Sequence, residues 1–152
     1  LLAGCAAPVV TSCYLTNTLD DEGEVGPGQF VWRPAGNRHV AWVSYPRLPE
    51  HRTPLLEKYC PKGVGSVFTI GVKGGYEMGV RLVDNCQLLS HVANIGDTRS
   101  LIIHPASTTH RQLDAEQLVA AGAGPEVVRL SIGLETAADI IADLEQALDA
   151  AA

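Results

Sequence analysis

The sequence predicts one α/β (α+β) domain in which helices pack on a sheet of about four strands. Strand-like and helix-like patterns alternate from residue 39 to the end, in four strand–helix pairs. The chain has 152 residues, of which 46% are hydrophobic and 18% are charged, so it is long enough to bury its own core. The pattern does not give the direction of the strands.

The first two strand–helix pairs cover residues 40–90. Residues 40–45 are strand-like and stop at Pro46. Thr53 or Pro54 then opens a short helix, because proline at an early helical position loses no hydrogen bond. The apolar run 66–72 predicts the next strand. A glycine pair then permits a tight turn into a longer helix over 76–90, whose apolar residues recur at steps of three and four.

The third pair surrounds a polar turn. Residues 100–103 predict a buried strand that ends at His104 and Pro105, because proline cannot donate to a central ladder. Asp114 with Gln117 resembles a capping box that opens a helix, and Gly122 ends it.

The fourth pair begins with the strand 127–133. Its period of two places Val128, Leu130 and Ile132 on one face, and Arg129 and Ser131 on the other. A last helix starts at the N-cap Thr136 and buries a stripe that ends at Leu148. Three acidic residues of this helix are expected to face solvent: Asp139, Asp143 and Glu145. Acid–base catalysis by Asp139 and Asp143 is not favoured, because an exposed helix surface neither shifts a pKa nor encloses a substrate.

Charge and composition exclude several classes of function. A formal net charge of -6 argues against a nucleic-acid or anionic-membrane partner. The cysteines form no CxxC motif and no zinc-like pairing with histidine, which predicts a reduced, cytoplasmic chain without a metal site. His104 and His110 bracket the proline turn, and we expect them to be ordinary turn histidines. The cysteines are Cys5, Cys13, Cys60 and Cys86.

Residues 1–36 are predicted to be an irregular leader in front of a domain at 37–152. The stretch LDDEGEVGPGQ at 19–29 has no sustained period of either kind. Residues 2–5, LAGC, resemble the end of a lipoprotein signal, but the charged and long apolar regions that precede such a site are absent from the sequence.

Arg129 is the main candidate for a binding residue. A guanidinium on a central strand has a rigid base and a planar fork of donors, which suits bidentate capture of a carboxylate or phosphate. The alternative is that Arg129 lies on a solvated face or pairs with a structural carboxylate, as most strand arginines do. The pattern alone leaves both open.

Several phrases resemble the Cys/Met-metabolism (transsulfuration) family of pyridoxal-phosphate enzymes, with the closest likeness to its O-acetylhomoserine sulfhydrylase branch. They are HVAWVSYPRLPEH at 39–51, YCPKGVGSVFTIGVKGG at 59–75, SHVANIGDTRS at 90–100, GDTRSLIIHPASTTH at 96–110 and VVRLSIGLE at 127–135. The resemblance implies the small C-terminal domain of that family, a mostly antiparallel sheet with helices on one face.

The same resemblance implies roles for individual residues. Arg129 matches the arginine that binds the α-carboxylate of the substrate, and Ser100 matches a serine beside the same pocket. Thr98 and Arg99 would line the approach. The leader departs from the family, which has a helix before the strand at 40–45.

The cofactor lysine of the family has no counterpart here. Its Schiff base forms in a Ser/Thr-rich motif of a large N-terminal domain, whereas Lys58, Lys62 and Lys73 have no Ser or Thr three residues before them. A Schiff-base lysine must be held against the cofactor by its surroundings. Pyridoxal 5'-phosphate is therefore implied by the family, and its lysine is expected outside this chain.

Three functions follow as hypotheses. The first is a C-terminal fragment of an O-acetylhomoserine sulfhydrylase, which replaces acetate by sulfide or a thiol in methionine and cysteine biosynthesis, is a homo-oligomer when whole, and is inactive as this fragment alone. The second is a truncated, pseudogene-like product without catalytic activity. The third is a small module that binds carboxylates or amino acids through Arg129 without a cofactor.

Overall fold

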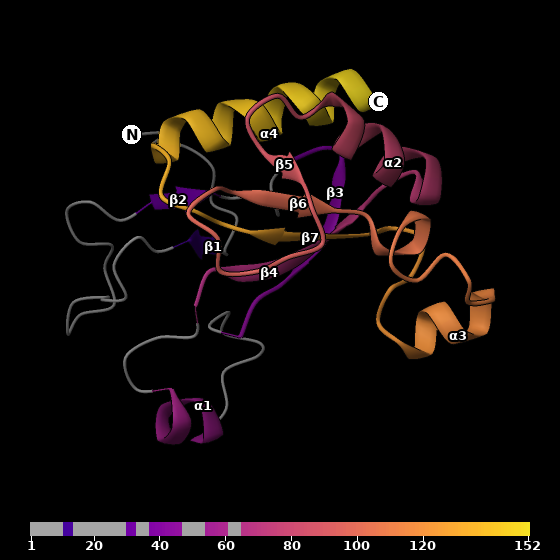
Figure 1. The fold of residues 1–152 in the computed structure, drawn as a ribbon, viewed down its shortest axis with the longest axis horizontal. Coiled ribbons are helices and arrows are strands. Elements are labelled where there is room, and N and C mark those ends of the chain that lie inside the picture. The colour runs from indigo at the N-terminus through magenta and orange to yellow at the C-terminus, as the bar shows by residue number, and fades with distance from the viewer. Residues whose placement is uncertain (1–10, 14–29, 33–36, 47–53, 61–64) are drawn as a thin grey trace.

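The computed structural model describes residues 11–13, 30–32, 37–46, 54–60 and 65–152. Its centre is a five-stranded sheet in the order β3-β4-β7-β6-β5 (Figure 1). These strands are β3 (Val40–Ser44), β4 (Val67–Val72), β5 (Ser90–His91), β6 (Leu101–Ile103) and β7 (Val127–Ser131). All neighbours run antiparallel except β5 and β6, which are parallel. The mostly antiparallel sheet implied by the resemblance is confirmed, with one strand more than the four expected.

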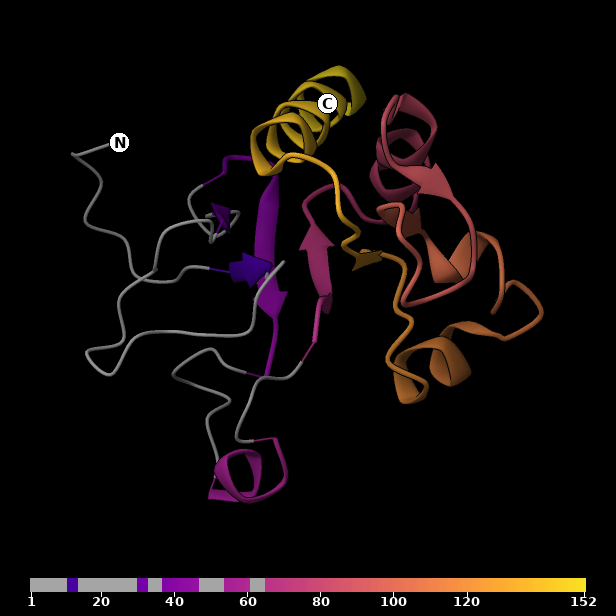
Figure 2. The same ribbon diagram turned by 60° about the vertical axis from the view of Figure 1, so that its left-hand side comes forward.

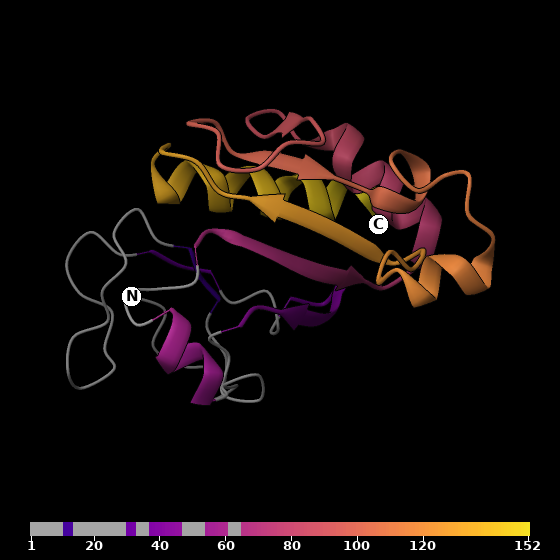
Figure 3. The same ribbon diagram turned by 60° about the horizontal axis from the view of Figure 1, so that its bottom comes forward.

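Helices α2 (Gly75–Asn85) and α4 (Ala137–Ala151) lie side by side on one face of this sheet (Figures 2 and 3). Alternate strand residues point toward them, as period-two patterning requires. The core includes Ile70, Val128 and Leu130 from the strands, and Leu82 and Leu144 from the helices, all without exposed surface. The sheet face opposite these helices is called the open face below.

The prediction of a helix over 76–90 was wrong at its C-terminal end. Helix α2 stops at Asn85, and Cys86 has extended backbone angles. The N–H groups of Gln87, Leu88 and Leu89 donate to the carboxylate of Asp143 on α4, at 2.8, 2.9 and 3.1 Å. The chain therefore leaves the helix early and continues into β5, the strand of the five-stranded sheet that was not predicted.

The expectation that Asp143 faces solvent was also wrong. Its side chain is 7% exposed and accepts a further bond from Gln146 Nε2 at 3.0 Å. Burial raises the pKa of Asp143, but the three backbone N–H groups and Gln146 outweigh this effect and hold the pKa below the usual 3.8. Asp139 and Glu145 are exposed as expected.

The two short helices form where their sequence signals predicted them. Helix α1 (Pro54–Tyr59) begins at its proline. Helix α3 (Ala115–Ala120) has the predicted capping box, in which the Asp114 side chain accepts from Gln117 N and the Gln117 side chain accepts from Asp114 N. Gly122 follows α3 with φ of 67°, a left-handed conformation that suits glycine.

In the leader, the structure describes two short strands that were not predicted. β1 (Thr11–Cys13) and β2 (Phe30–Trp32) pair antiparallel in a separate two-stranded sheet. The remaining residues of the leader, including the stretch at 19–29, lie outside the described residues. The boundary at residue 36 stays a prediction.

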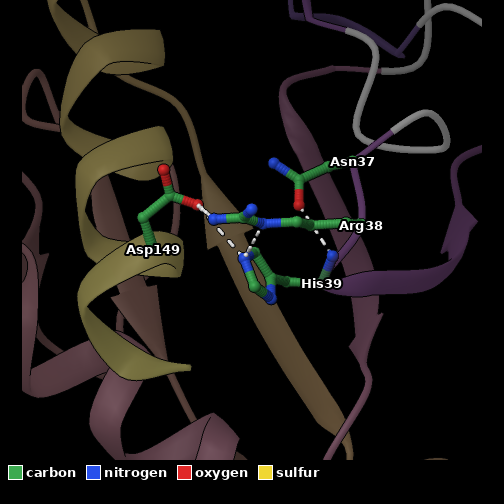
Figure 4. Close-up of polar contacts among 4 residues, drawn as sticks. All are labelled: Asn37, Arg38, His39 and Asp149. Carbon is green, nitrogen blue, oxygen red and sulfur yellow. Dashed lines mark hydrogen bonds and ion pairs between the residues drawn. The ribbon is translucent and has the colours of Figure 1, made fainter.

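A polar cluster ties the start of β3 to the last turns of α4 (Figure 4). Arg38 Nη2 and His39 Nε2 lie 3.2 and 3.1 Å from Asp149 Oδ1, and Arg38 Nε lies 2.7 Å from His39 Nε2. The imidazole nitrogen can accept from Arg38 or donate to Asp149, but not both at once. Because Arg38 and Asp149 are well exposed, this cluster contributes little to stability.

Candidate functional site

Arg129 lies on the open face, in the middle of the sheet. Strand β7 has β4 on one side and β6 on the other, and Arg129 is opposite Thr69 and Ile103 in these two strands. Its neighbours Val128 and Leu130 point into the core, so the alternation predicted for this strand is confirmed. The base of the arginine is therefore fixed by two strand ladders.

The guanidinium of Arg129 is half-buried and bonds to a neutral group. Its Nη2 donates to the carbonyl oxygen of Asn94 at 3.2 Å. Within the described part of the chain it pairs with no carboxylate, so the alternative of a structural ion pair is not met there. An arginine with a rigid base and a neutral partner retains donors for an anionic ligand.

Asn94 belongs to a segment that connects β5 to β6 and crosses the open face over β7 (Figure 1). We call residues 92–99 the crossing segment. Every second residue from 94 to 100 is bonded to β7 or to the chain just after it. The bonds are Arg129 Nη2 to the Asn94 carbonyl (3.2 Å), Gly96 N to Ser131 Oγ (3.2 Å), Leu134 N to the Thr98 carbonyl (2.8 Å) and Gly133 N to Ser100 Oγ (2.9 Å).

Ser100 has no exposed surface, and its polar groups are already engaged. Its N–H and hydroxyl donate to the two carboxylate oxygens of Glu135, at 2.7 and 2.8 Å, and its hydroxyl oxygen accepts the N–H of Gly133. The structure thus connects Ser100 to Arg129 through the crossing segment and not through a direct contact. A role for Ser100 beside a carboxylate stays a prediction.

Glu135 is a polar residue of this region that the sequence reasoning did not single out. Burial raises the pKa of its carboxyl, but bonds from the N–H groups of Ser100 and Glu135, the Ser100 hydroxyl and the charge of Arg99 outweigh this effect and lower the pKa. The carboxylate is therefore ionised at neutral pH. Its position four residues after the end of β7 is a weak signal, and its partner lies 35 residues away in the chain.

Thr98 and Arg99 are exposed parts of a turn held by Asp97. Asp97 Oδ1 accepts from Arg99 N at 3.1 Å and from Thr98 Oγ1 at 3.3 Å. The Arg99 N–H is the main cause that lowers the pKa of Asp97. Both residues therefore shape the end of the crossing segment, and their place along an approach to Arg129 stays a prediction.

His104 is not an ordinary turn histidine. It has no exposed surface, its Nε2 lies 2.9 Å from the carbonyl oxygen of Pro125, and its Nδ1 lies 2.9 Å from Ser107 Oγ. Gly79 of α2 is packed so closely on the ring that an added Cβ would lie 2.5 Å from it. His110 is closer to the ordinary turn histidine that was predicted, because its ring contacts the Thr109 hydroxyl near the surface.

The two lysines that the structure describes do not fit the Schiff-base position of a pyridoxal-phosphate site. Lys73 is exposed in the turn between β4 and α2, and Lys58 lies over the ring of Tyr59 on α1. Neither lysine is held in an enclosed position against a reactive atom, as a Schiff base requires. Lys62 lies outside the described residues.

The described ranges lack both a metal-binding cluster and a membrane-spanning helix. No group of three or more His, Cys, Asp or Glu is placed to bind a metal ion there. None of the described helices combines the length and apolar character needed to cross a bilayer.

Known proteins resemble this chain over most of its length. The family described as Cys/Met metabolism PLP-dependent enzyme matches residues 34–149. An O-acetyl-L-homoserine sulfhydrylase of Thermus thermophilus is 53% identical over 110 residues, which are 72% of this chain and 26% of that protein. A homocysteine synthase of Schizosaccharomyces pombe is 43% identical over 113 residues, which are 74% of this chain and 26% of that protein.

Two solved structures also resemble this chain. A structure from Campylobacter jejuni, assigned as an O-acetylhomoserine (thiol)-lyase, has a TM-score of 0.69 and 42% identity, and covers 76% of this chain and 28% of its own. It carries a pyridoxyl-lysine, which lies outside the part that this chain covers. A cystathionine gamma synthase of Xanthomonas oryzae in complex with cystathionine has a TM-score of 0.67 and 35% identity, and covers 77% of this chain and 30% of its own.

The chain spans about a quarter of the length of the curated relatives it matches. The matched residues 34–149 include every strand of the five-stranded sheet, the crossing segment and Arg129. This chain belongs to the Cys/Met metabolism family of PLP-dependent enzymes.

Proposed function

We propose that this chain is the C-terminal, carboxylate-binding part of a PLP-dependent O-acetylhomoserine sulfhydrylase. The observation that carries the proposal is the position of Arg129, which is fixed on a central strand with a half-exposed guanidinium and a neutral carbonyl as its partner. Family membership and the sulfhydrylase relatives support the choice of substrate class. The reaction would replace the acetate of O-acetylhomoserine by sulfide or a thiol.

Arg129 would hold the α-carboxylate of the amino acid. A charge-assisted, bidentate pair contributes roughly 2–3 kcal/mol of binding and fixes two oxygens in one plane. Ser100 and the crossing segment would support the edge of this site. Pyridoxal phosphate and its lysine would be contributed by the remaining three quarters of the enzyme, because the lysines described here do not fit that role. A cytoplasmic homo-oligomer is part of the same proposal.

The test is a chimera in which this chain replaces the matching quarter of the Thermus thermophilus relative. The chimera is expected to bind the cofactor and turn over O-acetylhomoserine. Arg129→Ala should then raise KM by about 10- to 100-fold, because a charge-assisted pair is lost, while cofactor absorbance stays unchanged.

The matched control for this variant is Arg111→Ala, which removes an exposed arginine of the turn before α3. The control should leave KM unchanged. An Arg129→Ala chimera with the KM of its parent would remove Arg129 from the site.

The other two hypotheses have their own measurements. Binding of free L-homoserine by the isolated 152-residue chain would favour the carboxylate-binding module, since the proposed fragment lacks the rest of its site. The mass of the native polypeptide decides between a fragment and a truncated product, because only a species several-fold larger than 16.1 kDa can include the cofactor lysine.

A further inference from the structure

We infer that Glu135 is a positioning residue, which fixes the crossing segment over β7 and thereby orients the guanidinium of Arg129. The two residues bind opposite ends of the same segment. Glu135 holds Ser100, the residue that follows the segment, and Arg129 holds Asn94 near its start. The part of this inference that concerns a ligand of Arg129 rests on the proposed function.

The contact of Glu135 with Ser100 is well suited to fix a chain. Both carboxylate oxygens are used, one on the N–H and one on the hydroxyl of the same residue, at 2.7 and 2.8 Å. Such a bidentate pair sets orientation as well as distance. The Ser100 hydroxyl is then left with its oxygen free to accept, and it accepts the N–H of Gly133. One hydrogen-bond network thus joins the chain after β7, the Glu135 carboxylate and the end of the crossing segment.

Gly133 fixes the same register by shape. A Cβ on Gly133 would lie 2.3 Å from the carbonyl oxygen of Thr98 and 2.6 Å from Ser100 N. The segment therefore lies directly on the backbone that follows β7. Leu134 N, on the next residue, donates to that same Thr98 carbonyl at 2.8 Å.

From this fixed end, the alternate bonds along the segment lead to Arg129. Gly96 is held by Ser131, and Asn94 then presents its carbonyl to the guanidinium. An arginine side chain has many rotamers, and restricting them before the ligand arrives reduces the entropy lost on binding. A segment released from Glu135 would hold the Asn94 carbonyl less firmly and leave Arg129 with more of its rotamers.

Nuclear magnetic resonance on the full 152-residue chain tests this directly. In Glu135→Gln, one oxygen remains for the Ser100 N–H, but the amide NH2 cannot accept from the hydroxyl. The variant should speed hydrogen exchange at the amides of Ser100 and Gly133, and also at the guanidinium Nη2–H of Arg129 that donates to Asn94, by several-fold. Glu145→Gln, which changes an exposed carboxylate on α4, is the matched control and should change none of these rates.

The Arg129 signal separates a positioning role from a local one. Changes at Ser100 and Gly133 with an unaltered Arg129 side chain would mean that Glu135 stabilises only its own neighbourhood, and the inference would be wrong. Glu135→Ala removes both acceptors and should give the larger effect. If it does not fold, Glu135→Gln alone decides.

Kinetics of the chimera test whether Glu135 also affects the binding of substrate. Glu135→Gln should raise KM for O-acetylhomoserine roughly 3- to 10-fold with a smaller change in kcat, since it alters how Arg129 is presented. In combination with Arg129→Ala it should have little further effect. An unchanged KM in Glu135→Gln beside a raised KM in Arg129→Ala would overturn the inference and leave the proposed function in place. An unchanged KM in Arg129→Ala would overturn the proposed function itself.

Discussion

His104 shows how one enclosed ring can link three parts of the domain. The Pro125 carbonyl can only accept, so Nε2 must bear the proton, and Nδ1 then accepts from the Ser107 hydroxyl. The edge of the ring packs on Tyr76, with centroids 5.1 Å apart. Burial lowers the pKa of His104, opposed by the bond to Pro125 and aided by the charge of His91. The neutral imidazole is the form that the fold accommodates.

This lowered pKa predicts a loss of stability on acidification. The unfolded histidine gains a proton as the pH falls below about 6.5, whereas the folded one resists it, so the free energy of unfolding should fall by up to about 1.4 kcal/mol per pH unit. Urea unfolding at pH 7.5, 6.5 and 5.5 measures this slope. His104→Asn should be less stable at pH 7.5 but lose less on acidification.

His110→Asn provides the control for that series, because it removes a histidine with a surface contact to Thr109. It should keep the slope of the parent chain. A slope that is the same in all three proteins would show that His104 does not cause it.

Residues of the site differ in how far the sequence could reveal them. Arg129 could be placed because a period of two needs only its neighbours along the strand. Glu135 and Asp143 could not, because their partners are backbone N–H groups more than 30 residues away, and such groups have no signature in the sequence. Asp143 lies on the buried stripe of α4, three residues after Ile140 and four before Ala147, and it was expected to face solvent because it is charged.

Helix α2 ends where a side chain from another helix replaces its hydrogen bonds. Past Asn85, the N–H groups that would have continued the ladder donate to Asp143 on α4. Cys86 marks this transition, with its Sγ 3.4 Å from the Leu82 carbonyl oxygen and its pKa raised to about 12, mainly by burial. Local propensity favours a longer helix, and a tertiary contact overrides it.

Asp143→Ala is therefore expected to destabilise the fold by about 2–4 kcal/mol, because it leaves buried N–H groups without an acceptor. Denaturant unfolding at neutral pH measures the loss. Glu145→Ala, two residues further along the same helix and exposed, should change stability by less than about 0.5 kcal/mol. Equal effects of the two substitutions would contradict the role given to Asp143.

For the molecule as a whole, the alternation of strands and helices predicted the layers correctly. The fifth strand was missed because β5 has only two residues, Ser90 and His91, and forms by pairing with β6. A strand of that length has no period of its own to read. The three-residue strands β1 and β2 were missed because they lie in the leader, which was predicted to be irregular.

The domain boundary gives a prediction at this level. Limited proteolysis is expected to trim the chain to near Gly36 and leave a resistant core, since the composition of residues 19–29 offers little to bury. Mass spectrometry of the fragments identifies the cleavage sites. Early cleavage after Lys58 or Lys73 would instead show that the predicted domain boundary near Gly36 is wrong.

Trp42 on edge strand β3 gives the open face an optical reporter. Its indole lies where a Cβ of Gly71 would be, and it is 37% exposed. Indole emission shifts to shorter wavelength when water is removed from the ring. The chain has one other tryptophan, Trp32. In a Trp32→Phe variant, the emission wavelength of Trp42 would therefore report whether this face is exposed to solvent or covered, without any label attached to the protein.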